Sequence, residues 1–324
     1  MAHLDSLMDV RLNAPAVVGV EEEPGSVIAR SRRRKFARVW RPLPVDRAHG
    51  QYSGSAALAQ GRHGRDMNGR LKTRIAAREV TIGTWMNIGH AAVAEIMADA
   101  GFDWLVIDLE HTAITIREAE ELIRIVDLKG VTPLVRVSAN DPVQIKRVLD
   151  AGAGGVIVPM VNSAADAAAA VRAVKYPPVG TRGVGIGRAH RYGPGFAEYE
   201  STVNESTIVV AQIEHKDAIA NLGEIQGTPG IDATIIGPYD LSASVGRPGL
   251  LDDPVVVALL RRYEADSKAA GKPLGVHVVP PRIELLQEKI AAGYTFLAYS
   301  VDFLFLGEAC RGDLARLRAP RGGD

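Results

Sequence analysis

Two carboxylates and an amide follow neighbouring apolar segments of the sequence. Gln212 and Glu214 end the segment VAQIE, and Asp240 follows the next apolar segment within GPYD. A hard site rich in oxygen atoms suits Mg²⁺ or Mn²⁺, with Co²⁺ as a further candidate, and suits structural zinc poorly. Each carboxylate could instead cap a helix or pair with a cation. Glu214 and Asp240 are therefore candidate metal ligands, provided that the fold brings them together.

A histidine and an arginine follow two other apolar segments. His111 comes directly after WLVIDLE, and Arg136 ends PLVR. Histidine exchanges protons near neutral pH, whereas arginine stays charged and can stabilise negative charge on a substrate oxygen. Beside a divalent ion, the two would support enolate chemistry next to a carbonyl group. The simpler alternatives are that His111 is only solvated and that Arg136 bridges carboxylates, with Glu110 as structural support.

The apolar segments that carry these residues have the length and composition of buried strands. The stretch from Phe102 to Thr112 passes from a nearly continuous apolar run into Asp108 without a turn residue. Such runs are typical of parallel strands that are covered by helices on both faces. Eight strands are predicted in this way, at 80–86, 104–109, 132–137, 155–161, 207–214, 233–237, 274–279 and 295–301.

Helical segments separate these strands. Periodicity predicts helices at 90–100, 116–128, 140–150, 163–176, 218–225, 255–270, 283–292 and 303–317. Strands that alternate with helices pair in parallel through right-handed crossovers, and eight such units close into a (β/α)8 TIM barrel. A doubly wound open sheet is the competing α/β architecture, but no GxGxxG motif opens a helix after the first strand. In a barrel the carboxyl ends of the strands meet on one face, which would gather the ionisable residues.

The composition limits the class of protein. The 324 residues carry a formal net charge of zero and are 47% hydrophobic, so a large core is available and a nucleic-acid partner is disfavoured. A single cysteine, Cys310, excludes an intramolecular disulfide and favours the cytoplasm. No apolar run is long enough to span a membrane, and residues 1–30 lack the pattern of a signal peptide.

Residues 1–66 differ from the rest of the chain. They contain an acidic triplet, Glu21 to Glu23, and a basic run, Arg32 to Lys35, without helical or strand periodicity. Blocks of like charge of this kind usually stay disordered. We expect a disordered or non-native extension at 1–66, followed by a TIM-barrel domain at 67–324. The alternative is a basic arm that contacts nucleic acid or a membrane surface.

A long segment between Tyr176 and Phe196, YPPVGTRGVGIGRAHRYGPGF, is rich in glycine and too long for an ordinary connection. Long ordered loops on a rigid scaffold are more often functional than accidental. Arg182 in this loop is a candidate substrate-binding residue that would contact an anion. Its alternative role is to order the loop.

Seven motifs in this order resemble the HpcH/HpaI family of metal-dependent pyruvate aldolases. They are GFDWLVIDLEHT, PLVRV, IKRVLDAG, GVIVPMV, YPPVGTRGVG, VAQIE and IGPYDLSASVG, all within residues 67–317. One motif alone would be unspecific, whereas the ordered set is not. The resemblance implies a class II aldolase, which cleaves a 4-hydroxy-2-oxo acid reversibly to pyruvate and an aldehyde with the help of a divalent metal ion. It also implies a homo-oligomer, which is a hexamer in typical members.

The resemblance further implies roles for individual residues. Glu214 and Asp240 match the metal ligands of the family, His111 matches its acid/base residue, and Arg136 matches its transition-state stabiliser. Asp150, which ends IKRVLD, matches the acid that raises the basicity of that histidine.

The part of the family site that holds pyruvate is matched by Gln212, Asp240 and the backbone around Tyr239. Family members often have a small residue in place of Tyr239, and the loop at 186–196 departs from the family pattern, so the aldehyde is not specified. Two other functions compete. One is a citrate-lyase-like carbon–carbon lyase that acts on an acyl-CoA thioester, and the other is a non-catalytic binding protein whose N-terminal arm carries the function.

Overall fold

The computed structural model describes residues 65–318, which lie within one compact unit of the chain, Gln60–Asp324. The prediction for residues 1–66 therefore falls outside the described residues, except for its last two residues. These two residues begin the first helix, α1 (Arg65–Ala76), so regular structure starts slightly earlier than predicted.

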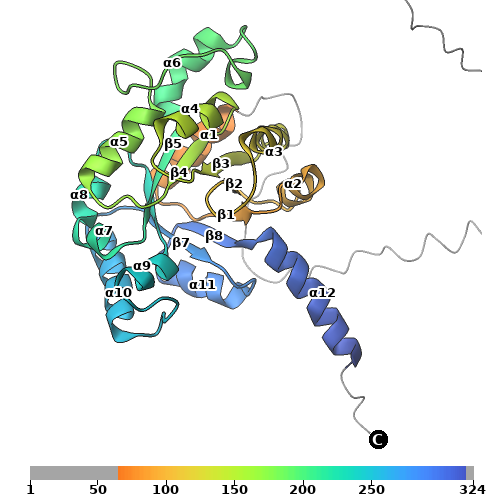
Figure 1. Cartoon of the computed structure of the whole chain (residues 1–324), viewed down its shortest axis with the longest axis vertical. Coiled ribbons are helices and arrows are strands. Elements are labelled where there is room, and N and C mark those ends of the chain that lie inside the picture. Colours follow the sequence, from red (N-terminus) through yellow and green to blue (C-terminus); the bar gives the residue numbers. More distant parts are fainter. Residues whose placement is uncertain (1–64, 319–324) are drawn as a thin grey trace, which may run out of the picture. The chain divides into compact units, whose positions relative to one another are not determined.

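A closed barrel of eight parallel strands forms the centre of the described part (Figure 1). Each strand pairs with the next one along the chain, and the last strand pairs with the first. The strands are β1 (Thr81–Met86), β2 (Trp104–Asp108), β3 (Thr132–Arg136), β4 (Gly155–Val158), β5 (Ile208–Ile213), β6 (Ala233–Ile236), β7 (Leu274–Val278) and β8 (Phe296–Val301). The predicted barrel is confirmed, and the open sheet is wrong because the ring has no free edge.

Helices surround the barrel in the predicted order (Figure 1). None of those within residues 65–318 is long and apolar enough to cross a membrane. The predicted helices are α2 (Ala91–Ala98), α3 (Ile116–Leu128), α4 (Pro142–Asp150), α5 (Ala164–Val174), α10 (Pro254–Ala269), α11 (Ile283–Ala291) and α12 (Asp302–Arg318). The helix predicted at 218–225 is divided into α7 (Lys216–Ala220) and α8 (Leu222–Gly227).

Periodicity does not predict every helix. It misses α1, α6 (Phe196–Ser206) and α9 (Pro238–Ser244). Hydrophobic periodicity detects only helices that bury an apolar stripe. Helix α6, for example, buries only Val203 among its described residues. The segment from Tyr176 to Phe196 is largely irregular, as predicted, with one short 3₁₀ turn, η2 (Arg188–His190).

Aromatic rings fill the interior of the barrel near its amino-terminal end. Trp104 and Phe296 are fully buried and stack with their ring centroids 4.3 Å apart. Gly83 on β1 makes room for them, because a Cβ atom at this position would lie 2.1 Å from the ring of Trp104. Leu71 and Ile75 of α1 belong to the same cluster. This helix therefore closes the amino-terminal end of the barrel.

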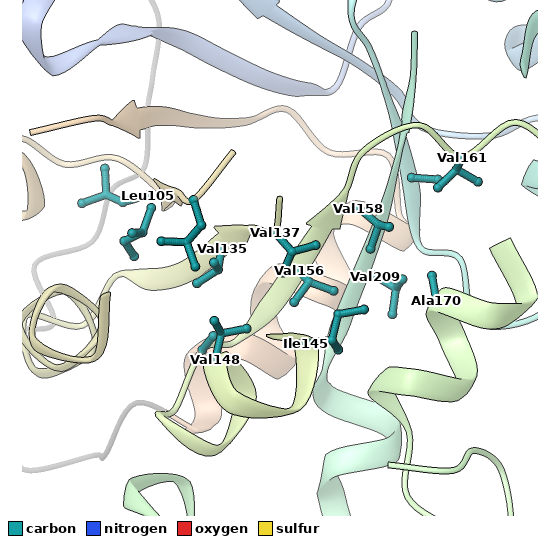
Figure 2. Packing of buried hydrophobic residues seen from close by; sticks show 14 of the residues in the cluster. Leu105, Val135, Val137, Ile145, Val148, Val156, Val158, Val161, Ala170 and Val209 are labelled. Atoms are coloured by element: carbon teal, nitrogen blue, oxygen red, sulfur yellow. The ribbon is translucent and has the colours of Figure 1, made fainter. Parts of the chain in front are cut away.

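The outward faces of the strands pack against the helices and form a second cluster (Figure 2). Val135 on β3 and Val156 on β4 lie in this cluster with Ile145 and Val148 of α4, and all four side chains are fully buried. Complete burial of one such side chain stabilises the fold by about 1.5–3 kcal/mol. The packing holds α4 against β3 and thereby fixes the place where β3 ends.

Side-chain caps fix the starts of the helices that follow β2 and β3. Thr115 and Glu118 form a capping box at the start of α3. The carboxylate of Asp141 accepts hydrogen bonds from backbone N–H groups at the start of α4, where Pro142 occupies the first turn, as predicted. Each cap contributes about 1 kcal/mol. The chain therefore leaves the carboxyl ends of both strands along defined paths.

Candidate active site

A pocket at the carboxyl-terminal end of the barrel collects most of the predicted site residues. Because all strands of a parallel barrel end on one face, side chains that are remote in sequence meet there. The residues that line it are Trp85, His111, Arg136, Gln212, Ile235, Ile236, Gly237, Pro238, Tyr239, Asp240, His277 and Val279. Five of the predicted site residues are therefore brought together, and Glu214 contacts one of them.

Arg136 is held by a buried carboxylate. Its Nε and Nη2 atoms donate hydrogen bonds to Asp108 at 2.8 and 2.7 Å. Burial alone would raise the pKa of Asp108, but the hydrogen bonds and charge of Arg136 outweigh it and hold the pKa below its ordinary value. Glu110 forms a second ion pair with Arg136 at 3.1 Å, and the guanidinium lies 4.3 Å from the ring centroid of Trp85. Arg136 thus bridges carboxylates and also lines the pocket.

Asp108 also shapes the turn that presents His111. Its Oδ1 atom accepts hydrogen bonds from the backbone N–H groups of Glu110 at 3.0 Å and His111 at 3.5 Å. The hydroxyl of Thr112 donates to the backbone carbonyl of Asp108. Side-chain bonds of this kind stabilise a turn without glycine. The side chain of His111 is 60% exposed, with Nε2 3.7 Å from a carboxylate oxygen of Glu110, so a proton on His111 can exchange with solvent.

Glu214 is buried beside Gln212. One of its carboxylate oxygens accepts a hydrogen bond from the backbone N–H of Met160 at 2.7 Å, and the other accepts one from the side-chain amide of Gln212. Burial raises the pKa of Glu214, and the negative charges of Glu110 and Asp240 add to this effect against the lowering effect of the two hydrogen bonds. The three carboxylates therefore lie close enough to repel one another.

These donors fit a divalent ion that keeps part of its coordination for water or substrate. Within residues 65–318, no three His, Cys, Asp or Glu side chains are grouped so that they could hold an ion by themselves. Mg²⁺ is commonly held by one or two carboxylates together with substrate and water oxygens, and Glu214 and Asp240 match that pattern. Burial is the main cause of the raised pKa values of Glu110 and Glu214, and repulsion from neighbouring carboxylates adds to it. A bound cation would favour the charged form of both side chains.

Two predicted site residues lie away from the pocket. Asp150 ends α4, and because α4 runs back along the barrel, Asp150 lies at the amino-terminal end, opposite to His111 of the same chain. Its carboxylate accepts a hydrogen bond from Arg182 at 2.6 Å. Arg182 is buried against the rings of Tyr176 and Tyr199 and does not line the pocket. The contacts of Arg182 therefore match the loop-ordering alternative and not the prediction of a substrate-binding residue.

Trp85 and His277 also line the pocket, and neither had a predicted role. Trp85 lies near the carboxyl end of β1 and His277 lies on β7, and their ring centroids are 5.3 Å apart. The alternation of side chains along a strand gives a hint for His277, since it places this residue on the same face as Gly275, toward the interior. An ionisable residue near the carboxyl end of a barrel strand could have been recognised as a site residue in this way.

The chain is similar to known proteins of one family. Residues 81–308 match the model of the HpcH/HpaI aldolase/citrate lyase family. The chain is 42% identical to a 2-dehydro-3,6-dideoxy-6-sulfogluconate aldolase from Pseudomonas putida over 226 residues, which are 69% of this chain and 88% of that protein. It is 40% identical to a hydroxypyruvate/pyruvate aldolase from Sagittula stellata over 234 residues, which are 72% of this chain and 91% of that protein. A crystal structure of an HpcH/HpaI aldolase/citrate lyase family protein from Burkholderia cenocepacia matches with a TM-score of 0.73 and 33% identity, covering 78% of this chain and 100% of that one.

Proposed function

The chain belongs to the HpcH/HpaI aldolase/citrate lyase family, and from this premise we propose that it cleaves a 4-hydroxy-2-oxo acid to pyruvate and an aldehyde by a metal-dependent, class II retro-aldol reaction. The relatives named as aldolases support the reaction type. The observation that carries the proposal is that Arg136, fixed by Asp108, faces the same pocket as His111 and Asp240.

The residues of the pocket divide the chemistry among them. Glu214 and Asp240 would hold a divalent ion, which would supply a Lewis acid for the keto group of the substrate. Arg136 cannot deprotonate and is held in place, so it stabilises the negative charge that develops on the substrate oxygen. Gln212 orients the carboxylate of Glu214 through its side-chain amide. His111 moves the proton of the substrate hydroxyl to and from solvent.

The pyruvate moiety is assigned to the wall formed by Gln212 and the backbone at Tyr239. Both residues line the pocket, as does Asp240, which follows Tyr239 in the sequence. A 2-oxo acid at this wall would share the pocket with Arg136.

Removal of the metal ion tests the first part of the proposal. Dialysis against a chelator should abolish retro-aldol activity, and Mg²⁺, Mn²⁺ or Co²⁺ should restore it. Titration with Mn²⁺, followed by the electron paramagnetic resonance of the free ion, should show binding that Glu214→Gln weakens by about tenfold or more. Glu120→Gln is the matched control, since Glu120 is an exposed carboxylate that pairs with Arg124. Full activity in metal-free buffer would remove Glu214 and Asp240 from this role.

Deuterium exchange of the pyruvate methyl group tests the role of Arg136 without an aldehyde. Arg136→Lys keeps the positive charge but cannot form two parallel hydrogen bonds with Asp108. Misplacement of the charge should slow the exchange by about 100-fold, as measured by NMR. Exchange at the wild-type rate would show that the arginine is misassigned.

The proposed partnership of Asp150 with His111 requires a second copy of the chain, because the two residues lie at opposite ends of one barrel. This supports a homo-oligomer, which the family resemblance implies to be a hexamer. Refolding an equal mixture of inactive Asp150→Asn and His111→Asn chains should restore about a quarter of the wild-type activity. Each shared site takes His111 from one chain and Asp150 from its neighbour, and both residues are intact in about a quarter of the sites. A mixture that stays inactive would contradict a shared site.

The competing functions can be separated by direct assays. The names of the relatives favour an aldolase over a citrate-lyase-like enzyme, and a screen of free 2-oxo acids against acyl-CoA thioesters distinguishes the two. A gel-shift assay of the full chain and of a chain that starts at Met67 tests the non-catalytic alternative, and we expect no shift. The cytoplasm stays a predicted location, based on the single cysteine, Cys310.

A further inference from the structure

The pocket contains a histidine that the proposed reaction does not use. His277 lines the pocket next to Trp85. Burial lowers the pKa of His277 to about 4, and the nearby charge of Arg136 acts in the same direction. The imidazole is therefore uncharged at neutral pH. It cannot attract a substrate anion by charge and can only form neutral hydrogen bonds.

A backbone carbonyl decides which ring nitrogen carries the proton. The Nε2 atom of His277 lies 2.9 Å from the carbonyl oxygen of Ser300 on β8. A carbonyl oxygen only accepts hydrogen bonds, so Nε2 is the N–H donor and Nδ1 keeps its lone pair. No donor among residues 65–318 bonds to Nδ1, and this atom is not one of the buried polar atoms without a partner. Nδ1 is therefore an acceptor that no described residue satisfies, on a side chain that lines the pocket.

An acceptor in this position selects for a substrate that carries a donor. Pyruvate offers only carboxylate and keto oxygens, which accept hydrogen bonds and cannot pair with Nδ1. A hydroxyl group on the other half of the substrate can donate to it. The pocket lining also contains one arginine and no lysine, and that arginine, Arg136, is already bound to Asp108 and Glu110. The proposed reaction uses Arg136 for the oxygen of the pyruvate-derived half, so the described lining residues of one chain offer no second arginine or lysine for a negatively charged aldehyde.

We propose that His277 is a specificity-determining residue whose Nδ1 atom accepts a hydrogen bond from a hydroxyl group on the aldehyde-derived half of the substrate. This inference rests on the proposed aldolase function and narrows it. The aldehyde is then a short hydroxyaldehyde. The ring of Trp85 beside His277 offers an apolar surface for its carbon chain.

The test compares two aldehydes of nearly equal size as acceptors for pyruvate. Glycolaldehyde carries a hydroxyl group where propionaldehyde carries a methyl group. The wild-type enzyme should prefer glycolaldehyde in kcat/KM by about tenfold, the effect of one good hydrogen bond. His277→Leu should lose this preference, and His277→Asn, which places an amide oxygen near the position of Nδ1, should keep part of it. Val279→Ala is the control, because it changes the same pocket without removing an acceptor and should keep the preference.

Each result is the ratio of the kcat/KM values for the two aldehydes within one variant, so a general loss of activity does not affect it. A wild-type ratio near one would overturn the role of His277 even if His277→Leu does not fold. An unchanged ratio in His277→Leu would do the same. A second arm uses hydroxypyruvate in place of pyruvate, and an effect of His277→Leu confined to this arm would overturn the assignment to the aldehyde-derived half.

Deuterium exchange of the pyruvate methyl group in the wild-type enzyme keeps the two proposals apart. If exchange occurs and the aldehyde ratio does not depend on His277, only the role of His277 is refuted. If no exchange occurs with metal present, the aldolase proposal itself is refuted.

Discussion

Replacing Asp108 by asparagine should destabilise the fold and misplace Arg136 at the same time. The asparagine side chain has the same size, but it has no charge and one of its two acceptor oxygens becomes a donor amide. That amide would face Nε or Nη2 of Arg136, or the side-chain amide of Asn87 at 3.3 Å, all of which also donate. The Arg136 side chain, which is only 12% exposed, would keep Glu110 as its remaining anionic partner.

The structure indicates the size of the effect. Removing one member of a buried ion pair costs about 3–5 kcal/mol. We expect a value near the lower end, about 3 kcal/mol, because the amide oxygen of Asn can keep one hydrogen bond to Arg136 and because Glu110 stays in place. For a domain of this size, the melting temperature Tm should fall by about 6–12 °C. The exchange of pyruvate methyl protons should slow by about 100-fold, since a small displacement of a catalytic group is enough for such a loss.

Urea unfolding followed by circular dichroism measures the loss of stability, with an unchanged m-value as the sign of a common unfolded state. Glu120→Gln is the matched control, and its exposed pair with Arg124 should contribute less than about 0.5 kcal/mol. The pKa of Asp108 is lowered in the folded state. The contribution of its charge to the free energy of unfolding is therefore complete above about pH 4 and is lost as the pH falls through the pKa of the folded state. A loss below about 1 kcal/mol, or a difference that persists in acid, would refute the reasoning.

Three other predictions concern positions outside this pair. Gly83→Ala should lower the free energy of unfolding by about 1–3 kcal/mol or more, since its Cβ would lie 2.1 Å from the ring of Trp104; denaturation at the wild-type urea concentration would contradict it. The pKa of His277 is lowered to about 4, so between its ordinary value of about 6.5 and this value the unfolded chain binds a proton that the folded chain does not. The free energy of unfolding should therefore decrease as the pH is lowered through this window, and His277→Asn should remove this part of the decrease. Parallel curves of stability against pH for the two proteins would contradict the prediction. Thr115→Ala removes the capping box with Glu118 and should lower the free energy of unfolding by about 1 kcal/mol. The exchange of pyruvate methyl protons should not change, and a loss of exchange would contradict a purely structural role of Thr115.

The kinds and order of the elements could be predicted because they depend on residues that are neighbours in the sequence. Apolar runs predicted all eight strands of the barrel, and Asp141 and Pro142 predicted the start of α4. Once a parallel barrel was expected, strand ends had to meet on one face. For this reason Arg136 and Asp240 could be assigned to one pocket before the structure was known.

The tertiary structure decided which groups touch, and this set the properties of the site. Arg182 and Asp150 pair across 32 residues, and only the folded loop shows that Arg182 is buried away from the pocket. His277 is uncharged because it is buried, and its proton lies on Nε2 because β8 presents the carbonyl of Ser300. Burial and charge depend on every group that is near in space, whereas hydrophobic periodicity reports only on neighbours along the chain. The chemistry of individual side chains therefore could not be determined before the barrel was closed.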